Sequence, residues 1–248
     1  METFTESKVI KYKDRKPIRW LFQQLINLNL HLLTDFEVFG VENIPTSGGL
    51  LVISNHFSFI DPVVLIQIMP RPIEFVGGSM LPNSPLILRW IPRVWGTYKV
   101  HRGASSRDAL SAAQSIINSG GALGIFPEAG SWAKVLRPPR PGTALLAART
   151  GAPILPVGLD GLTEVFPSLR CGKRSKVTIN IGKIFGPFKH AIHGRQDRII
   201  LDKIGHQMML KISELIPPEK RGYYSDDPKI REDAKGTEVY PWENTQED

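Results

Sequence analysis

Residues 48–62 read GGLLVISNHFSFIDP, and this stretch decides the fold. The apolar and β-favouring run LLVIS after two glycines is typical of a short buried strand. Asp61 and Pro62 stand directly before the apolar run VVLIQIM, and Asp followed by Pro is a strong signal for the start of a helix. The stretch therefore predicts a strand, a turn and a helix, with His56 leaving the strand and Asp61 as the helix cap.

His56 and Asp61 are five residues apart. In a continuous helix this spacing would rotate the two side chains roughly 140° away from each other. In a strand it would place them on opposite faces. The two side chains can meet only if the turn FSFI folds the chain back, so two interpretations stand side by side. Either they are partners in proton transfer, or His56 is incidental and Asp61 only caps the helix.

Outward from this stretch, strand and helix signals alternate. This alternation predicts an α/β fold with a mixed, largely parallel central sheet flanked by helices, over residues 36–216. Strands are expected at 36–39, 50–54, 73–76, 97–100, 122–126, 154–159 and 176–181, and helices at 62–69, 85–91, 107–118, 142–150 and 196–215.

The N-terminal segment, residues 1–35, is basic and then helical. Residues 17–34 carry apolar side chains at 18, 21, 22, 25, 28 and 32, with the period of one helix face. Polar residues interrupt the run, so it does not read as a membrane span. The preceding basic side chains are Lys8, Lys11, Lys13, Arg15, Lys16 and Arg19. A basic flank with Trp20 and Phe22 fits a helix at a membrane interface, and a core-packing first helix is the alternative.

The C-terminal segment, residues 217–248, is polar and acidic. From Glu219 onward it holds nine acidic and five basic residues, whereas the whole chain has a formal net charge of +7. We expect an extended or disordered tail, anchored by Tyr240 and Trp242. The basic body in front of it suggests an anionic partner, such as a phosphorylated substrate, an anionic membrane surface or nucleic acid.

Several classes of protein are disfavoured by composition and motif. A single cysteine, Cys171, rules out an internal disulfide and a zinc site of paired cysteines. No P-loop and no G-x-S-x-G nucleophile motif occurs, and the glycines at 120, 121 and 124 precede a strand rather than open a helix. The polar first residues do not resemble a signal peptide. We expect no metal, no bound cofactor and no nucleic-acid partner, and a cytoplasmic setting.

Polar side chains follow the expected strands at their carboxyl ends, where open α/β sheets bind ligands. His56 follows one strand, Arg102 another and Glu128 a third. The segment KVLRPPRPG, residues 134–142, adds Lys134, Arg137 and Arg140. We expect a base and an anion-binding loop at one edge of the sheet.

Four motifs in order resemble the glycerolipid acyltransferases typified by 1-acylglycerol-3-phosphate acyltransferase. The first, N-H-x4-D, matches Asn55-His56 through Asp61, and the second matches Gly96 and Arg102 in GTYKVHR. The third, F-P-E-G, is matched in part by FPEAGSW at 126–132, and the fourth by Leu155-Pro156-Val157. Together they span about residues 50–160.

The resemblance implies acyl transfer from a thioester to a hydroxyl, without an acyl-enzyme. His56 would be the general base and Asp61 would orient it. Gly96, Arg102 and Glu128 would form the glycerophosphate site, with Arg102 on the phosphate and Pro156 near the acyl donor. The alternative for Arg102 and for Glu128 is a structural ion pair.

The third motif departs from the family pattern, because Ala129, Gly130 and Ser131 follow the glutamate and no arginine stands there. Lys134, Arg137 or Arg140 would replace that arginine on the phosphate, with Gly130 close by. The departure also leaves open an acceptor without a phosphomonoester.

The expected substrates are a lysophospholipid and an acyl thioester, either acyl-CoA or acyl carrier protein, and the expected product is phosphatidic acid. The stretch LILRWIPRVWG, residues 86–96, combines Trp90 and Trp95 with Arg89 and Arg93, which suits a bilayer interface; a core helix is the alternative. We expect peripheral or monotopic association with the cytoplasmic face of a membrane. The rivals are the same chemistry on glycerol 3-phosphate, another lysolipid or a glycolipid, and a non-catalytic basic module that binds lipid or nucleic acid.

Overall fold

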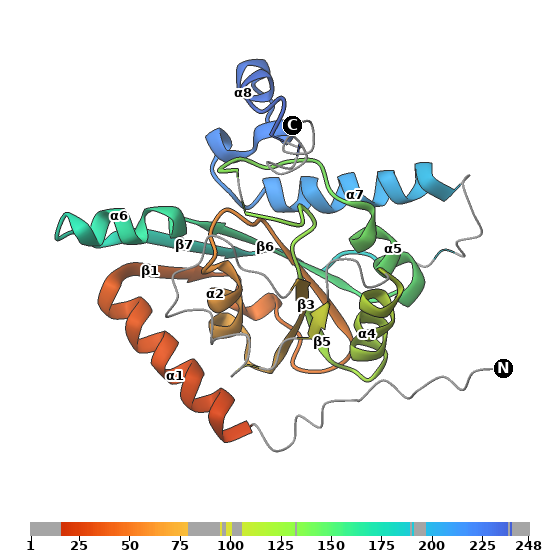
Figure 1. Ribbon diagram of the computed structural model, residues 1–248, viewed down its shortest axis with the longest axis horizontal. Helices are drawn as coiled ribbons and strands as arrows, with labels where there is room; N and C mark the ends of the chain where they lie inside the picture. Colours follow the sequence, from red (N-terminus) through yellow and green to blue (C-terminus); the bar gives the residue numbers. More distant parts are fainter. Residues whose placement is uncertain are drawn as a thin grey trace, which may run out of the picture.

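The computed structural model describes residues 16–78, 95, 98–100, 106–131, 133–188, 190, 197–237 and 239. Figure 1 shows these residues as one twisted sheet with helices on both faces. Several features expected from the sequence lie outside the described residues: the helix at 85–91, the motif residues Gly96 and Arg102, and the tail anchors Tyr240 and Trp242.

The described part of the chain forms a sheet of seven strands in the order β1-β7-β6-β2-β5-β3-β4. The strands from β6 to β4 run parallel to one another, whereas β7 is antiparallel to β6 and parallel to β1. The bounds are β1 (Thr34–Phe39), β2 (Leu50–Ser54), β3 (Ile73–Gly78), β4 (Tyr98–Val100), β5 (Ala122–Ile125), β6 (Ile154–Asp160) and β7 (Ser175–Ile181). The predicted fold class, a mixed and largely parallel sheet, is confirmed.

Two apolar layers cover the sheet. On one face, buried side chains of the sheet pack with α1 (Lys16–Leu33), α2 (Asp61–Ile68) and the segment around α6 (Val165–Arg170). On the other face they pack with α4 (Ser106–Asn118), α5 (Pro141–Thr150) and α7 (Arg198–Ser213). The central strand β2 is buried along its whole length, as its uninterrupted apolar sequence predicts.

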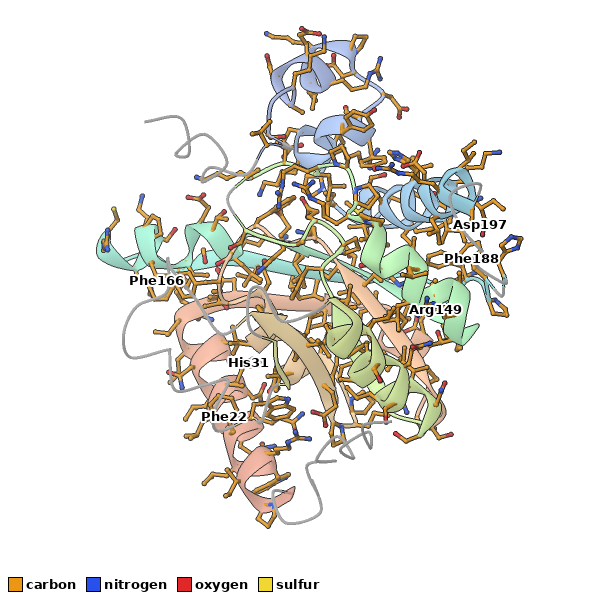
Figure 2. The ribbon with its side chains drawn as sticks, turned by 45° about the vertical axis from the view of Figure 1, so that its right-hand side comes forward. Phe22, His31, Arg149, Phe166, Phe188 and Asp197 are labelled. Carbon is orange, nitrogen blue, oxygen red and sulfur yellow. The ribbon has the colours of Figure 1, made fainter. Side chains whose placement is uncertain are left out.

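The first helix presents two different faces. Phe22 and Ile26 of α1 are buried against the sheet, and Figure 2 marks Phe22 and His31 along this helix. The opposite face carries large apolar side chains that are 39–63% exposed, namely Ile18, Trp20, Leu21, Leu25, Leu28, Leu32 and Leu33. Most of the predicted apolar face of the helix is therefore the exposed one. Among the described helices, none is long and apolar enough to cross a bilayer.

The expectation of an extended or disordered tail from residue 217 is wrong as far as residue 237. This part forms η6 (Pro218–Lys220), η7 (Gly222–Tyr224) and α8 (Pro228–Asp233). The backbone N–H of Leu136 donates to the carbonyl of Lys220 at 2.9 Å, and that of Tyr223 donates to the carbonyl of Leu136 at 3.1 Å. These hydrogen bonds order a segment whose polar composition gave no sign of packing.

Gly161 allows the chain to turn directly after β6. Its φ is +81°, and a Cβ atom there would lie 2.0 Å from the carbonyl oxygen of Lys176. Gly120 has a similar φ of +83° but open space around it. We expect Gly120→Ala to lower the free energy of unfolding by only the left-handed backbone cost of about 1–2 kcal/mol. Gly161→Ala should cost more, because the β6 turn must also move away from β7.

Urea unfolding of both variants beside the wild type measures this difference. Equal losses in the two variants would contradict the close approach of the Gly161 turn to β7.

Candidate active site

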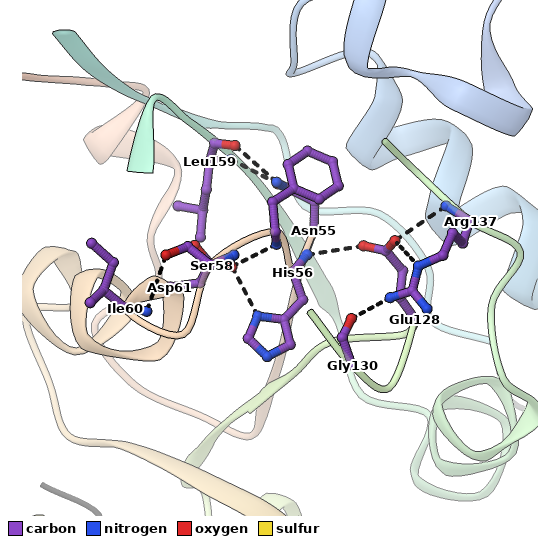
Figure 3. A network of polar contacts seen from close by, with 10 residues as sticks. Asn55, His56, Ser58, Ile60, Asp61, Glu128, Gly130, Arg137 and Leu159 are labelled. Carbon is purple, nitrogen blue, oxygen red and sulfur yellow. Dashed lines mark hydrogen bonds and ion pairs between the residues drawn. The ribbon is translucent and has the colours of Figure 1, made fainter. Parts of the chain in front are cut away.

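The carboxyl ends of three neighbouring strands form the site. The strand β2 lies between β5 and β6, and its last residue is followed by Asn55 and His56. Glu128 follows β5, as the sequence predicted, and Phe126, expected as the last residue of this strand, also lies just after it. Figure 3 draws Asn55, His56 and Glu128 within a network of polar contacts.

The turn after β2 brings His56 and Asp61 together. The backbone N–H of Asp61 donates to the carbonyl of Ser58 at 3.2 Å, so the chain reverses before α2 begins. His56 Nδ1 then lies 2.9 Å from Asp61 Oδ2. The same oxygen accepts the backbone N–H groups of Phe57 and Ser58, each at 2.8 Å. The turn is thus wrapped around one carboxylate oxygen.

Asp61 does not cap the helix as expected. It is the first residue of α2, Ile60 holds the N-cap position, and the Asp61 carboxylate accepts hydrogen bonds from the preceding turn. The side chain is buried, and burial raises the pKa of the Asp61 carboxyl above its ordinary value, while His56 and the two backbone N–H groups oppose this rise. The donors that face Oδ2 favour the ionised form that an orienting carboxylate requires.

Three contacts fix the position of His56, two through its imidazole ring and one through its backbone. Its ring stacks on Phe126, with centroids 4.1 Å apart and planes inclined by 21°. Its backbone N–H donates to Glu128 Oε1 at 2.9 Å, and Nδ1 faces Asp61. The side chain keeps 17% of its surface exposed. Because Nδ1 faces a carboxylate, Nε2 is the nitrogen left to accept a proton.

Glu128 holds the site from within. Its side chain is fully buried; Oε1 accepts the N–H of His56, and Oε2 accepts the N–H of Arg137 at 3.2 Å and lies 3.3 Å from Arg137 Nε. Burial raises the pKa of Glu128 to about 7, and the charge of Arg137 opposes this rise. In this geometry Glu128 positions His56, and its carboxylate is not exposed to an acceptor.

The basic side chains of residues 134–142 differ in exposure. The Arg137 side chain is only 2% exposed; its guanidinium pairs with Glu128 and donates to the carbonyl of Gly130. The Arg137 guanidinium is therefore not accessible to a phosphate in this structure. Lys134 is 77% exposed, with Nζ 3.9 Å from Glu164. Arg140 stands at the N-cap position of α5, and its backbone N–H donates to the carbonyl of Pro127 at 2.8 Å.

Pro156 belongs to the sheet and is not part of the polar network in Figure 3. It is buried inside β6, in register with Ile53 of β2, and its ring faces Gly182. Nothing in its described surroundings brings it to His56. Gly96 and Arg102 lie outside the described residues, although the strand between them, β4, is placed at the edge of the sheet beside β3.

The sequence motif included Asn55 without giving it a role, and the structure supplies one. Its Nδ2 donates to the carbonyl of Leu159 at 2.9 Å, and the N–H of Leu159 donates to its Oδ1 at 2.8 Å. These two bonds extend the pairing of β2 with β6 and fix the start of the His56 turn. An amide at a strand end can make such a pair, but sequence alone does not name its partner.

A small cavity lies against Asp61 and Phe57. It has a volume of about 60 Å³ and is also lined by Lys134, Asp160 and Lys220. Lys220, from the C-terminal segment, forms an ion pair with Asp160 here. The cavity is smaller than the several hundred Å³ of typical ligand pockets, so it can hold water but not a lipid. No group of acidic, histidine or cysteine side chains among the described residues could hold a metal ion.

Comparisons with known proteins identify a family that this chain resembles. Residues 35–160 match the model of the protein family described as Acyltransferase. A chloroplastic 1-acyl-sn-glycerol-3-phosphate acyltransferase of Brassica napus is 27% identical over 172 residues, which cover 67% of this chain and 48% of that protein. The enzyme of the same name from Borreliella burgdorferi is 30% identical over 136 residues, 52% of each chain. The chain thus spans about half the length of these relatives.

A solved structure supports the fold. The crystal structure of the 1-acyl-sn-glycerophosphate acyltransferase PlsC from Thermotoga maritima superposes with a TM-score of 0.57. The two sequences are 22% identical, and the superposition covers 80% of this chain and 81% of the PlsC chain.

The raised pKa of Glu128 predicts a pH dependence of stability. In the unfolded chain this carboxyl ionises near 4.5, and in the folded protein at about 7. The folded state therefore holds a proton that the unfolded state has lost, and the stability this proton contributes is lost as the pH rises from about 4.5 through about 7. Glu128→Gln should remove this slope. Above about pH 7, where Glu128 is ionised, the variant also leaves the buried Arg137 without a charged partner and should lower the free energy of unfolding by about 3–5 kcal/mol.

Urea unfolding at several pH values compares the variant with the wild type, and Glu42→Gln, at an exposed position, is the control. A Glu128→Gln protein that keeps the wild-type slope would show that Glu128 does not cause it.

Proposed function

This chain belongs to the acyltransferase family, and we propose that it transfers an acyl chain from a thioester to the free hydroxyl of 1-acylglycerol-3-phosphate, giving phosphatidic acid. The observation that carries this proposal is the contact of 2.9 Å between His56 Nδ1 and Asp61 Oδ2. The names of the relatives support the acceptor. The donor is acyl-CoA or acyl carrier protein, and the reaction needs no bound cofactor.

The first step is general-base catalysis by His56. Nδ1–H donates to Asp61, so Nε2 carries the lone pair that takes the proton of the acceptor hydroxyl. The oxygen attacks the thioester carbonyl as it loses this proton, and a tetrahedral intermediate forms. The carboxylate of Asp61 keeps the ring in this tautomer and stabilises the imidazolium, the part an aspartate plays in a Ser-His-Asp triad.

The second step returns the proton. The tetrahedral intermediate collapses, the carbon–sulfur bond breaks, and the thiolate receives the proton from His56 Nε2. The products are an ester and a free thiol, and His56 is neutral again. The acceptor hydroxyl is the nucleophile throughout, which agrees with the absence of a nucleophile motif in the sequence.

Two buried residues, Glu128 and Arg137, act through His56. Glu128 holds the backbone N–H of His56, and Arg137 holds Glu128, so a displacement of either residue would shift the base. The exposed Lys134 is the described member of the basic loop that is best placed to approach the acceptor phosphate. Arg102 and Gly96 join it by family resemblance, and Arg140 and Gly130 lie on the same loop system.

The acceptor is presented by a membrane surface. The exposed apolar face of α1 follows a basic N-terminal segment, and this combination suits insertion among anionic lipid headgroups. Trp20, which is 62% exposed, has the side chain that favours the interface. We therefore assign the protein to peripheral association with a membrane through α1. Trp95 is excluded from this role, because it is only 1% exposed.

A transfer assay tests the reaction and the acceptor together. Labelled acyl-CoA is offered with lysophosphatidic acid, lysophosphatidylcholine, glycerol 3-phosphate or a glycolipid. We expect transfer to lysophosphatidic acid, with a loss of at least about 100-fold in His56→Ala, because general-base action supplies about 10²–10⁴-fold. Asp61→Asn should lower the rate as well, since the amide keeps the shape but not the charge.

Transfer only to an acceptor without a terminal phosphate would keep the mechanism and replace the substrate. If acyl carrier protein donors also gave no transfer to any acceptor, a non-catalytic binding module would become the better interpretation.

Flotation with liposomes tests the membrane association. We expect the protein to float with anionic vesicles at low salt and to be released in part by salt, because screening weakens the basic contribution. The variant Leu21→Ser/Leu25→Ser should float less, since it removes two exposed apolar anchors without touching the core. A wild-type protein that stays in the soluble fraction at low salt would refute this association.

A further inference from the structure

A buried arginine fastens α1 to the sheet. Arg19 was expected in the basic flank of the helix, but it is only 4% exposed. Its guanidinium donates to both carboxylate oxygens of Glu74 in β3, at 2.7 and 3.0 Å. Nε and Nη2 also donate to the backbone carbonyl of Trp95, at 3.0 and 2.8 Å. Nearly the whole donor fork is directed at two neighbours.

Trp95 completes this fastening. Its ring lies 4.7 Å from the Arg19 guanidinium carbon and 6.3 Å from the ring of Phe22, both on α1. Its indole N–H donates to the carbonyl of Ile73 at 2.8 Å. Trp95 directly precedes Gly96 in the sequence, and β4 follows two residues later. One cluster thus joins α1, β3 and the residue that precedes the second motif.

The helix α1 is also attached to α2 by a hydrogen bond. Gln23 Nε2 donates to the carbonyl of Ile66 at 2.8 Å, near the end of α2. The helix α2 begins at Asp61, so α1 is attached by polar contacts both to the helix of the catalytic carboxylate and to the Trp95 cluster. The face of α1 that points away from these contacts is the exposed apolar one.

A buried ion pair is a costly way to fix a helix. Removing two charges from water cancels most of their attraction, and an apolar pair of similar size would stabilise the fold equally well or better. The arginine adds a defined orientation, because its planar guanidinium can donate all of these hydrogen bonds in only one arrangement of Glu74 and the Trp95 carbonyl. This geometry suits a contact that fixes the angle between a helix and the sheet beside it.

We propose that Arg19 is a positioning residue, which through Glu74 and Trp95 sets the angle between the bilayer-facing helix α1 and the active site. This inference rests on the proposed function. In this inference the lysophospholipid lies in the bilayer and α1 binds the bilayer surface. The angle that Arg19 sets then determines whether the acceptor hydroxyl reaches His56 Nε2. A soluble acceptor does not depend on this angle.

The test compares one reaction in two settings. Lysophosphatidic acid is presented in anionic vesicles or as a short-chain form that is soluble as a monomer. The central variant is Arg19→Met/Glu74→Met, which keeps an apolar contact and leaves no buried charge unpaired. Arg19→Lys keeps the charge without the fork. The control Lys176→Met breaks an ion pair between β7 and β1 whose side chains are 70% and 48% exposed.

We expect the double variant to fold, to bind vesicles like the wild type and to act normally on the soluble acceptor. With vesicles its kcat/KM should fall by about 10- to 100-fold, because small misplacements have effects of this size. Arg19→Lys should fall by less, and Lys176→Met should match the wild type in both settings.

Three results would overturn the inference. Equal losses in both settings would make Arg19 a structural support of the site itself, and no loss in either would reduce it to packing. Weaker vesicle binding by the double variant would show that the pair only keeps α1 folded. A wild type that transfers to neither form of the acceptor would instead reject the proposed function, and the inference with it.

Discussion

The buried carboxylate of Asp61 is the contact on which the site depends. A turn that leaves a parallel strand exposes its N–H groups, and here two of them, from Phe57 and Ser58, converge with His56 Nδ1 on one oxygen. The oxygen therefore shapes the turn and orients the base in a single arrangement. A side chain at position 61 that cannot accept these hydrogen bonds would therefore disturb the turn as well as the orientation of His56.

A second buried carboxylate makes this arrangement rigid. Glu128 follows β5, and it holds the backbone of His56 while Asp61 holds the ring. The two acidic groups are buried, the charge of Asp61 adds to the cost of ionising Glu128, and Arg137 supplies the opposing charge. Such a cluster gains little stability over an apolar core, so its value lies in the position it imposes on the imidazole.

The sequence predicted what is local or periodic. Strands such as β2 and β6 and the helix after Asp61 follow from apolar runs and from the Asp-Pro start signal, and the strand ends placed His56 and Glu128 at one edge. It could not predict the partners of long polar side chains. Arg19 was expected in a basic flank and Arg137 in an anion-binding loop, yet Arg19 is buried against Glu74 of β3 and Arg137 against Glu128 of its own connecting segment. Which face of α1 is exposed likewise depends on where Phe22 and Arg19 find their contacts.

The contacts of Arg137 with Glu128 and Gly130 bear on how the proposed acceptor would be recognised. In the family pattern that the third motif resembles, an arginine after the glutamate would reach phosphate with a planar fork. Here the loop directs its arginine at Glu128, and the exposed cation beside the site is Lys134. A lysine is a mobile point charge that does not impose a bidentate geometry. In the proposed reaction, recognition of the headgroup by Lys134 would rest on charge rather than on shape, and the orientation of the acceptor would come from other contacts. Among the described residues, the helix α1, which Arg19 joins to β3, is the element that we propose for this orientation.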